Sequence, residues 1–169
     1  MAELVLVRPK LVINTTTHSA TLEDVPQLVR MMEEFYAEAG FSLDRDWTSD
    51  SFSALLADRS RGAIWIVFKD GQPAGYAVLT LRFSMEHGGL DAFIDDLFIR
   101  PAHRRRGLGR LALEALFHEC RKRGVVAVHV EVGRDNAPAQ SLYASYGLAR
   151  RKDLREVLTV SLCYDGVQV

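Results

Sequence analysis

The sequence predicts a single α/β domain over residues 1–169, with a mixed, mostly antiparallel sheet of about six to seven strands and about four helices on its faces. Three observations predict it. Two apolar runs flank an Asp-Gly-Gln-Pro segment, which is typical of an antiparallel hairpin. Strand-like and helix-like periodicities then alternate, which favours a β-α-β unit. No repeat, low-complexity tract or flexible linker divides the chain.

The predicted strands are apolar or β-branched runs bounded by turn residues. The run at 125–132 is nearly continuously apolar, which predicts a strand in the middle of the sheet, covered on both faces. Residues 1–10 lack the long apolar stretch and cleavage site of a secretory signal, so we expect a short extension or an edge strand there. The predicted strands cover residues 11–17, 63–69, 74–83, 92–99, 125–132 and 156–162.

The predicted helices have apolar residues at spacings of three and four. They cover residues 22–39, 49–57, 107–123 and 137–146. The first begins at a Thr21-x-x-Asp24 capping signal, although Pro26 leaves Asp24 as an alternative cap. Glycines follow the first, third and fourth helices, as is common at helix ends.

The composition narrows the classes of protein. The chain has 169 residues, of which 48% are hydrophobic, enough for one core. A formal net charge of −1 argues against a non-specific nucleic-acid or membrane-surface binder. The two cysteines, Cys120 and Cys163, form no disulfide framework and fit a reducing cytosol, so we expect a cytoplasmic protein. No apolar run approaches the roughly 20 residues of a membrane span.

An arginine- and glycine-rich loop lies where the strand at 92–99 gives way to a helix. Backbone N–H groups and the helix dipole at such a junction can hold an anion. Glycine lets a phosphate approach the backbone closely, and arginine binds phosphate oxygens in a bidentate manner. Taken alone, the loop also fits a solvated charged turn. Its sequence is Arg104-Arg105-Arg106-Gly107-Leu108-Gly109-Arg110.

A second motif gives this loop its context. The segment Asn136-x-x-Ala139-x-x-x-Tyr143-x-x-x-Gly147 follows one helix and one strand later. Together with Arg104-x-x-Gly107-x-Gly109, it resembles the GNAT superfamily of N-acetyltransferases, whose acetyl-CoA signature has the loop's spacing. The pattern of elements is similar to that family over nearly the whole chain. One departure is Arg105, where the family often has glycine, so we expect the local backbone to differ there.

The resemblance implies acetyl-CoA as the acetyl donor, with no metal. The pantetheine arm would lie along the strand at 92–99, the arginine-rich loop would hold the pyrophosphate, and Tyr143 would protonate the departing sulfur as a general acid. An aromatic packed on the helix face is the alternative for Tyr143. The implied cofactor residues are Leu97, Phe98, Ile99, Arg104, Arg105, Arg106, Gly107, Leu108, Gly109, Arg110, Asn136 and Tyr143.

The acceptor side contains candidate bases for deprotonating an amine. Asp95 and Asp96 follow each other in a strand and should point to opposite faces, so at most one faces the acceptor. In polyamine-acetylating members of the family this strand reads Leu-Glu-Asp, which is similar to residues 94–96 here. Glu131 on the next strand is a further candidate. For each carboxylate, a purely structural pairing is an equal alternative. The resemblance implies a primary amine of a small molecule or peptide as acceptor.

Two other functions are compatible with parts of the sequence. An acyl-CoA-binding sensor without turnover is the main alternative, favoured if Tyr143 and both aspartates face the core. A nucleotide or nucleic-acid binder is disfavoured by the near-neutral charge and the missing Walker lysine. The oligomeric state stays open, a homodimer included. Three acids, Glu38, Asp44 and Asp46, either attract a cationic amine or are surface charge.

No metal site is predicted from the histidines, because they show no ligand spacing with other His, Cys or acidic residues. Cys120 is interpreted as a small core residue and His129 as a satisfied core histidine. The histidines are His18, His87, His103, His118 and His129.

Overall fold

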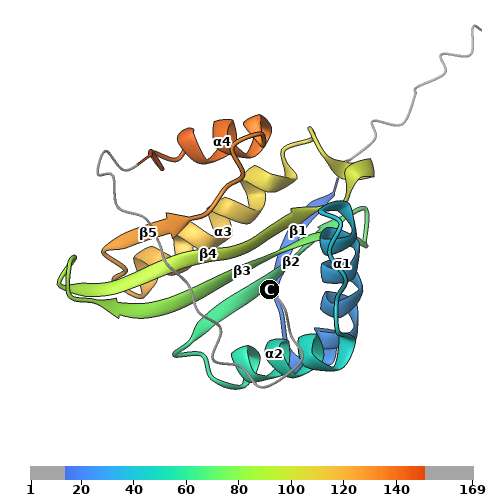
Figure 1. The fold of residues 1–169 in the computed structure, drawn as a ribbon, viewed down its shortest axis with the longest axis horizontal. Coiled ribbons are helices and arrows are strands. Elements are labelled where there is room, and N and C mark those ends of the chain that lie inside the picture. Colours follow the sequence, from blue (N-terminus) through green and yellow to red (C-terminus); the bar gives the residue numbers. More distant parts are fainter. Residues whose placement is uncertain (1–13, 151–169) are drawn as a thin grey trace, which may run out of the picture.

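The computed structural model describes residues 14–150, so the predicted N-terminal extension and the predicted strand at 156–162 lie outside the described residues. Five strands form one sheet in the order β1-β2-β3-β4-β5 (Figure 1). Three pairings are antiparallel and the β4–β5 pairing is parallel, so the sheet is mixed. The strands are β1 Thr15–Ser19, β2 Gly62–Lys69, β3 Gln72–Ser84, β4 Gly89–Ile99 and β5 Ala127–Val130. The α/β class is confirmed, whereas six to seven strands is too many for the described part.

The helices cover both faces of this sheet, as Figure 1 shows. On one face lie α1 (Val25–Glu38) and α2 (Arg45–Ala57), and on the other lies α3 (Leu108–Lys122). The short α4 (Ala137–Ala144) lies beside α3, where Leu142 comes close to Gly109. None of the described helices is long and apolar enough to cross a bilayer.

The sheet separates two apolar cores because successive side chains of a strand point to opposite faces. In β2, Ile64 and Ile66 pack under α1 and α2, while Trp65 and Val67 pack under α3. Burial of each such side chain stabilises the fold by about 1.5–3 kcal/mol. Cys120 belongs to the α3-side core, which agrees with its interpretation as a small apolar residue.

Two local signals explain where elements begin and turn. The predicted β2–β3 hairpin is present, and its turn residues Asp70 and Gly71 have φ values of 51° and 76°. Such left-handed pairs match the twist of a hairpin. Helix α2 begins at Arg45, four residues before the predicted start, because the Asp44 carboxylate accepts hydrogen bonds from the backbone N–H groups of Asp46 and Trp47. This N-cap was missed in the sequence.

Strand β5 is shorter than predicted. It spans Ala127–Val130 instead of 125–132, and its four residues are only half-buried. Among the described residues it is the last strand of the sheet, so the prediction of a covered middle strand is not met in this part of the chain.

Candidate active site

A groove of about 530 Å³ lies between the end of β4, the loop before α3, and α4. All predicted cofactor residues line it except Arg106 and Tyr143. A smaller hollow of about 380 Å³ lies beside β1 and α2, and no predicted site residue lines it. The residues of the larger groove are Phe35, Glu38, Leu97, Phe98, Ile99, His103, Arg104, Arg105, Gly107, Leu108, Gly109, Arg110, Asn136, Pro138, Ala139 and Leu142.

Strands β4 and β5 diverge beside this groove. Their parallel ladder runs from the Asp91–Ala127 pair to the Ile94–Val130 pair and then stops. From residue 95 to the end of β4, no strand of the described chain pairs on that side, whereas β3 pairs on the other side as far as Ile99. Unpaired backbone N–H and C=O groups along a strand edge can accept an extended chain as an additional strand.

The N-terminus of α3 faces the same groove. Gly107 is its N-cap, with φ at 84° and no side-chain capping hydrogen bond. The first N–H groups of a helix have no intrahelical acceptor and carry the positive end of its dipole. The groove residues Leu108, Gly109 and Arg110 supply these groups. The arrangement is therefore suited to an anion such as a diphosphate.

Arg105 occupies the position where the resembling family often has glycine. Its φ is 61°, in the left-handed region that glycine adopts at least cost. A different backbone is thus not needed to accommodate the arginine, because Arg105 takes the conformation that glycine favours. Arg105 and Arg106 are both exposed.

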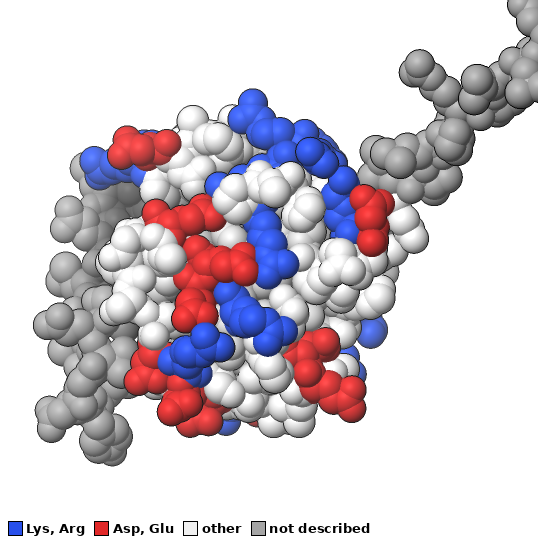
Figure 2. All heavy atoms as spheres, turned by 90° about the vertical axis from the view of Figure 1, so that its right-hand side faces the viewer, with Lys and Arg blue, Asp and Glu red and all other residues white. Residues whose placement is uncertain are grey.

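Arg104 is already engaged by protein groups. Its Nη2 donates to both oxygens of Glu38 at 2.9 and 2.6 Å, and its Nε donates to the carbonyl of Ile99 at 2.7 Å. Arg100 likewise pairs with Glu34 at 2.7 Å. On the side of the molecule shown in Figure 2, basic and acidic side chains accordingly alternate. The main role of Arg104 is therefore to hold the loop against α1. It adds little free positive charge.

The acids of the α1–α2 region are also partly occupied. Glu38 is paired with Arg104, and the Asp44 carboxylate caps α2. These two carboxylates are therefore structural, and the alternative in which they attract a cationic amine loses support.

A β-bulge at Asp95 changes the predicted geometry of β4. Val78 of β3 pairs with Asp96, but the next residue, Leu79, pairs with Ile94, so Asp95 is the extra residue. A bulge interrupts the alternation of side chains. Ile94 packs in the α3-side core, whereas Asp96 reaches Tyr76 in the core under α1 and α2. Simple alternation therefore does not hold between Ile94 and Asp96, and the prediction that placed Asp95 and Asp96 on opposite faces loses its basis.

Asp96 is the most perturbed carboxylate of the site. Its Oδ2 accepts a hydrogen bond from the hydroxyl of Tyr76 at 3.0 Å. Burial raises the pKa of Asp96 to about 6; the Tyr76 hydrogen bond opposes this rise and the charge of Asp95 adds to it. A carboxylate with such a pKa is ionised near neutral pH yet basic enough to take a proton.

Besides burial, the charge of Asp96 contributes to the raised pKa values of three tyrosines. Burial, followed by the charge of Asp96, raises the pKa of Tyr143 to about 12 and also raises the pKa values of Tyr36 and Tyr76. Tyr36 and Tyr76 were not singled out in the sequence, where each belongs to an apolar helix or strand pattern. Their relation to Asp96 depends on the β3–β4 register with its bulge.

Tyr143 lies deeper than predicted. Only 7% of it is exposed, and it belongs to the α3-side core without lining the groove. Its packing role is therefore present in the structure. The influence of Asp96 on its pKa places the phenol within electrostatic reach of the candidate base.

Glu131 lies just beyond the end of β5, not within a strand as predicted. Burial, and then the charge of Glu131, raises the pKa of Asp95. Asp95, Asp96 and Glu131 thus gather negative charge at the place where β4 and β5 diverge.

The fold and this groove define an enzyme of the acetyltransferase class. The chain belongs to the acetyltransferase (GNAT) family, whose model matches residues 27–148. With its relatives, this match identifies it as an acetyl-CoA-dependent N-acetyltransferase.

Known proteins support this assignment. The chain is 27% identical to a Bacillus subtilis protein provisionally assigned as a ribosomal protein bS18-alanine N-acetyltransferase, over 69% of this chain and 74% of that protein. It is 30% identical to the Escherichia coli ribosomal protein bS18-alanine N-acetyltransferase over 60% of this chain, and this match spans 63% of the E. coli enzyme. The crystal structure of an integron cassette protein from the mobile metagenome of Cole Harbour Salt Marsh superposes with a TM-score of 0.78 and 41% identity, covering 87% of this chain and 90% of that one.

Proposed function

We propose that this enzyme moves the acetyl group of acetyl-CoA directly onto a primary amine of a small molecule or peptide. The observation that carries the proposal is the edge of β4 from Asp95 to Ile99, which is unpaired within residues 14–150 and leads to the N-terminus of α3, where no side chain caps the first N–H groups. An amide-bearing arm and a diphosphate are the two parts of acetyl-CoA that need these two features.

The donor would bind along this path. The pantetheine arm pairs with the β4 backbone near Leu97 and Ile99, and the pyrophosphate accepts hydrogen bonds from the first N–H groups of α3. The exposed Arg105 and Arg106 add positive charge at the loop. Asn136, which lines the groove from the start of α4, contacts the cofactor from the other side.

The ammonium form of the acceptor would lose one proton to Asp96, directly or through a water molecule, and the neutral amine would then attack the thioester carbonyl; the second nitrogen proton passes to solvent as the amide forms. A backbone N–H of the Leu97 region stabilises the oxyanion, and collapse of the tetrahedral intermediate breaks the C–S bond. Tyr143 then gives its proton to the departing thiolate and regains one from solvent. With a pKa of about 12, the phenol is protonated at neutral pH, as a proton donor must be.

The charges around the acceptor favour a cationic amine. Asp95, Asp96 and Glu131 lie where β4 and β5 diverge, and together they attract an ammonium group. The acceptors named for the B. subtilis and E. coli relatives are alanines of a ribosomal protein, which makes a peptide α-amine a natural first probe.

An assay of CoA thiol release tests the proposal. Purified protein and acetyl-CoA are incubated with peptides that begin with alanine and with small mono- and diamines, and each peptide is matched by the same sequence with a blocked N-terminus. We expect release that depends on a free amine, together with a product heavier by one acetyl group. Tight acetyl-CoA binding without turnover on any amine would contradict the proposal and favour the sensor alternative.

Tyr143→Phe should lower kcat by about 10²-fold, because the departing thiolate loses its proton donor. The dissociation constant of acetyl-CoA should stay within a few-fold, since Tyr143 does not line the groove. Steady-state kinetics and calorimetry measure the two effects. Tyr146→Phe is the matched control, because Tyr146 stacks on Phe117 and its pKa is raised by burial and then by Glu114, not by Asp96. Equal kcat values for both variants would leave Tyr143 with its packing role alone.

A further inference from the structure

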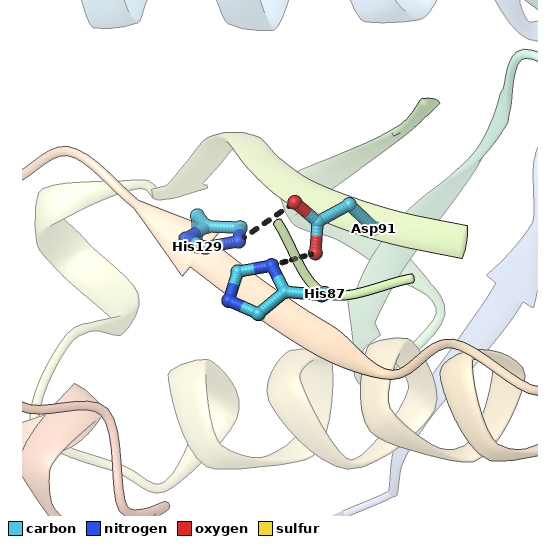
Figure 3. Close-up of side chains that lie close together, drawn as sticks. All are labelled: His87, Asp91 and His129. Carbon is cyan, nitrogen blue, oxygen red and sulfur yellow. Dashed lines mark hydrogen bonds and ion pairs between the residues drawn. The ribbon is translucent and has the colours of Figure 1, made fainter. Parts of the chain in front are cut away.

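A cluster of two histidines and one aspartate lies at the start of β4 (Figure 3). His87 belongs to the turn between β3 and β4, Asp91 to β4, and His129 to β5. The cluster is separate from the acetyl-transfer site, because Asp91 precedes Asp95 by four residues, or roughly 13 Å of strand.

The ligand atoms of the cluster are spaced for a metal ion. His87 Nδ1 lies 3.3 Å from Asp91 Oδ1, and His129 Nε2 lies 3.0 Å from Asp91 Oδ2. The three ligand atoms all lie within 4.8 Å of one another. In a tetrahedral zinc site, with bonds of about 2.0–2.1 Å, neighbouring ligand atoms are about 3.4 Å apart. Small side-chain movements would therefore place all three around one ion.

The carboxylate at the centre needs compensation. The Asp91 side chain is 0% exposed, and within residues 14–150 its Oδ1 makes no hydrogen bond and has only the 3.3 Å ion-pair contact with His87 Nδ1. A buried charge without full pairing is costly, and a cation supplies the missing partner. The side chains of His87 and His129 are 31% and 22% exposed, which gives an ion a path to the carboxylate.

Carboxylate and imidazole are ligands that zinc commonly takes in proteins. One group opposes an ion: Arg82 Nη2 lies 3.4 Å from Asp91 Oδ2. The Arg82 side chain is 66% exposed and can turn into solvent.

We propose that His87, Asp91 and His129 bind one divalent transition-metal ion, with zinc as the ion of choice and water in the fourth position. The two imidazoles bind as neutral ligands, so binding releases any proton that they share with Asp91. The ion ties the β3–β4 turn to β5 and takes no part in acetyl transfer. Spacing along the chain does not indicate this cluster, because it is the β4–β5 pairing that brings His129 to Asp91.

Zinc titration of the untagged full-length protein, stripped with a chelator and dialysed, tests the proposal. Competition with a chromophoric chelator should give one zinc per chain. His87→Ala and His129→Ala should each weaken binding by at least about tenfold to 10²-fold, the loss that removal of a supporting metal contact commonly brings. The matched control is His118→Ala, which removes an exposed histidine of α3 and should leave binding unchanged.

A melting experiment gives a second measurement. Added zinc should raise the Tm of the parent protein and of His118→Ala, but not of His87→Ala. Asp91 is fully buried, so Asp91→Asn risks misfolding. The Tm comparison therefore uses a variant of His87, which lies in a turn. Absence of stoichiometric zinc binding, or binding that survives both His87→Ala and His129→Ala, would overturn the metal site and leave a hydrogen-bonded cluster.

Discussion

Gly107→Asp should weaken acetyl-CoA binding by about 10²-fold or more. The new carboxylate would stand at the N-terminus of α3, where it would repel the pyrophosphate and compete for the same N–H groups. A Cβ at this position would meet nothing within 4 Å, so the loss would not come from a steric clash within the protein. The dissociation constant from calorimetry measures the effect.

Gly107→Asn is the matched control for this change. Gly107 has φ at 84°, a left-handed conformation that asparagine tolerates better than most residues. Asparagine has nearly the shape of aspartate without its charge, so the difference between the two variants isolates the electrostatic effect. If Gly107→Asp binds acetyl-CoA as tightly as Gly107→Asn, the helix N-terminus does not hold the pyrophosphate.

Asp96→Asn should reduce kcat by about 10²–10⁴-fold while making the protein more stable at pH 7.5. The loss follows from removal of the general base. The gain follows from burial, which raises the pKa of Asp96 to about 6 in the folded protein. Ionisation of Asp96 therefore costs folding free energy, by about 1–3 kcal/mol once the pH is above this value.

The change in stability caused by Asp96→Asn should depend on pH. A raised carboxyl pKa favours the folded state below the unfolded value of about 3.9, and this contribution is lost as the pH rises through about 6. Denaturant unfolding should therefore show Asp96→Asn to be more stable than the parent protein at pH 7.5, with the difference shrinking towards pH 4. In the parent enzyme, kcat/KM should fall below about pH 6 as Asp96 becomes protonated.

Asp95→Asn is the control that separates the two carboxylates. Asp95 is the bulge residue, and burial and then the charge of Glu131 raise its pKa. Loss of the Asp95 carboxylate should therefore lower turnover less than loss of the Asp96 carboxylate. A larger loss of kcat for Asp95→Asn than for Asp96→Asn would transfer the base to Asp95.

Local signals in the sequence were enough to locate several elements of the fold and the loop that lines the groove. Hydrophobic periodicity located α1 and α3, the Asp-Gly turn located the β2–β3 hairpin, and the spacing from Arg104 to Gly109 located the loop before α3. Each of these depends on residues close together in the chain. The cofactor roles of the loop residues remain predictions.

Features that depend on strand register could not be predicted in this way. The bulge at Asp95 exists only relative to β3, and no pattern within residues 92–99 indicates it. Tyr76 reaches Asp96 across that same pairing, 20 residues away in sequence. His129 meets Asp91 only because β5 lies parallel to β4. The Asp44 cap, by contrast, was a local signal that was present and missed.

The ion pairs of Arg100 and Arg104 make two distant segments of the chain depend on each other. Their partners, Glu34 and Glu38, lie four residues apart and therefore on one side of α1. That side of the helix binds the loop that precedes α3. A substitution of Glu34 or Glu38 would therefore release the loop before α3 as well as change the surface of α1, so these two segments are coupled although the paired residues lie 66 positions apart in sequence.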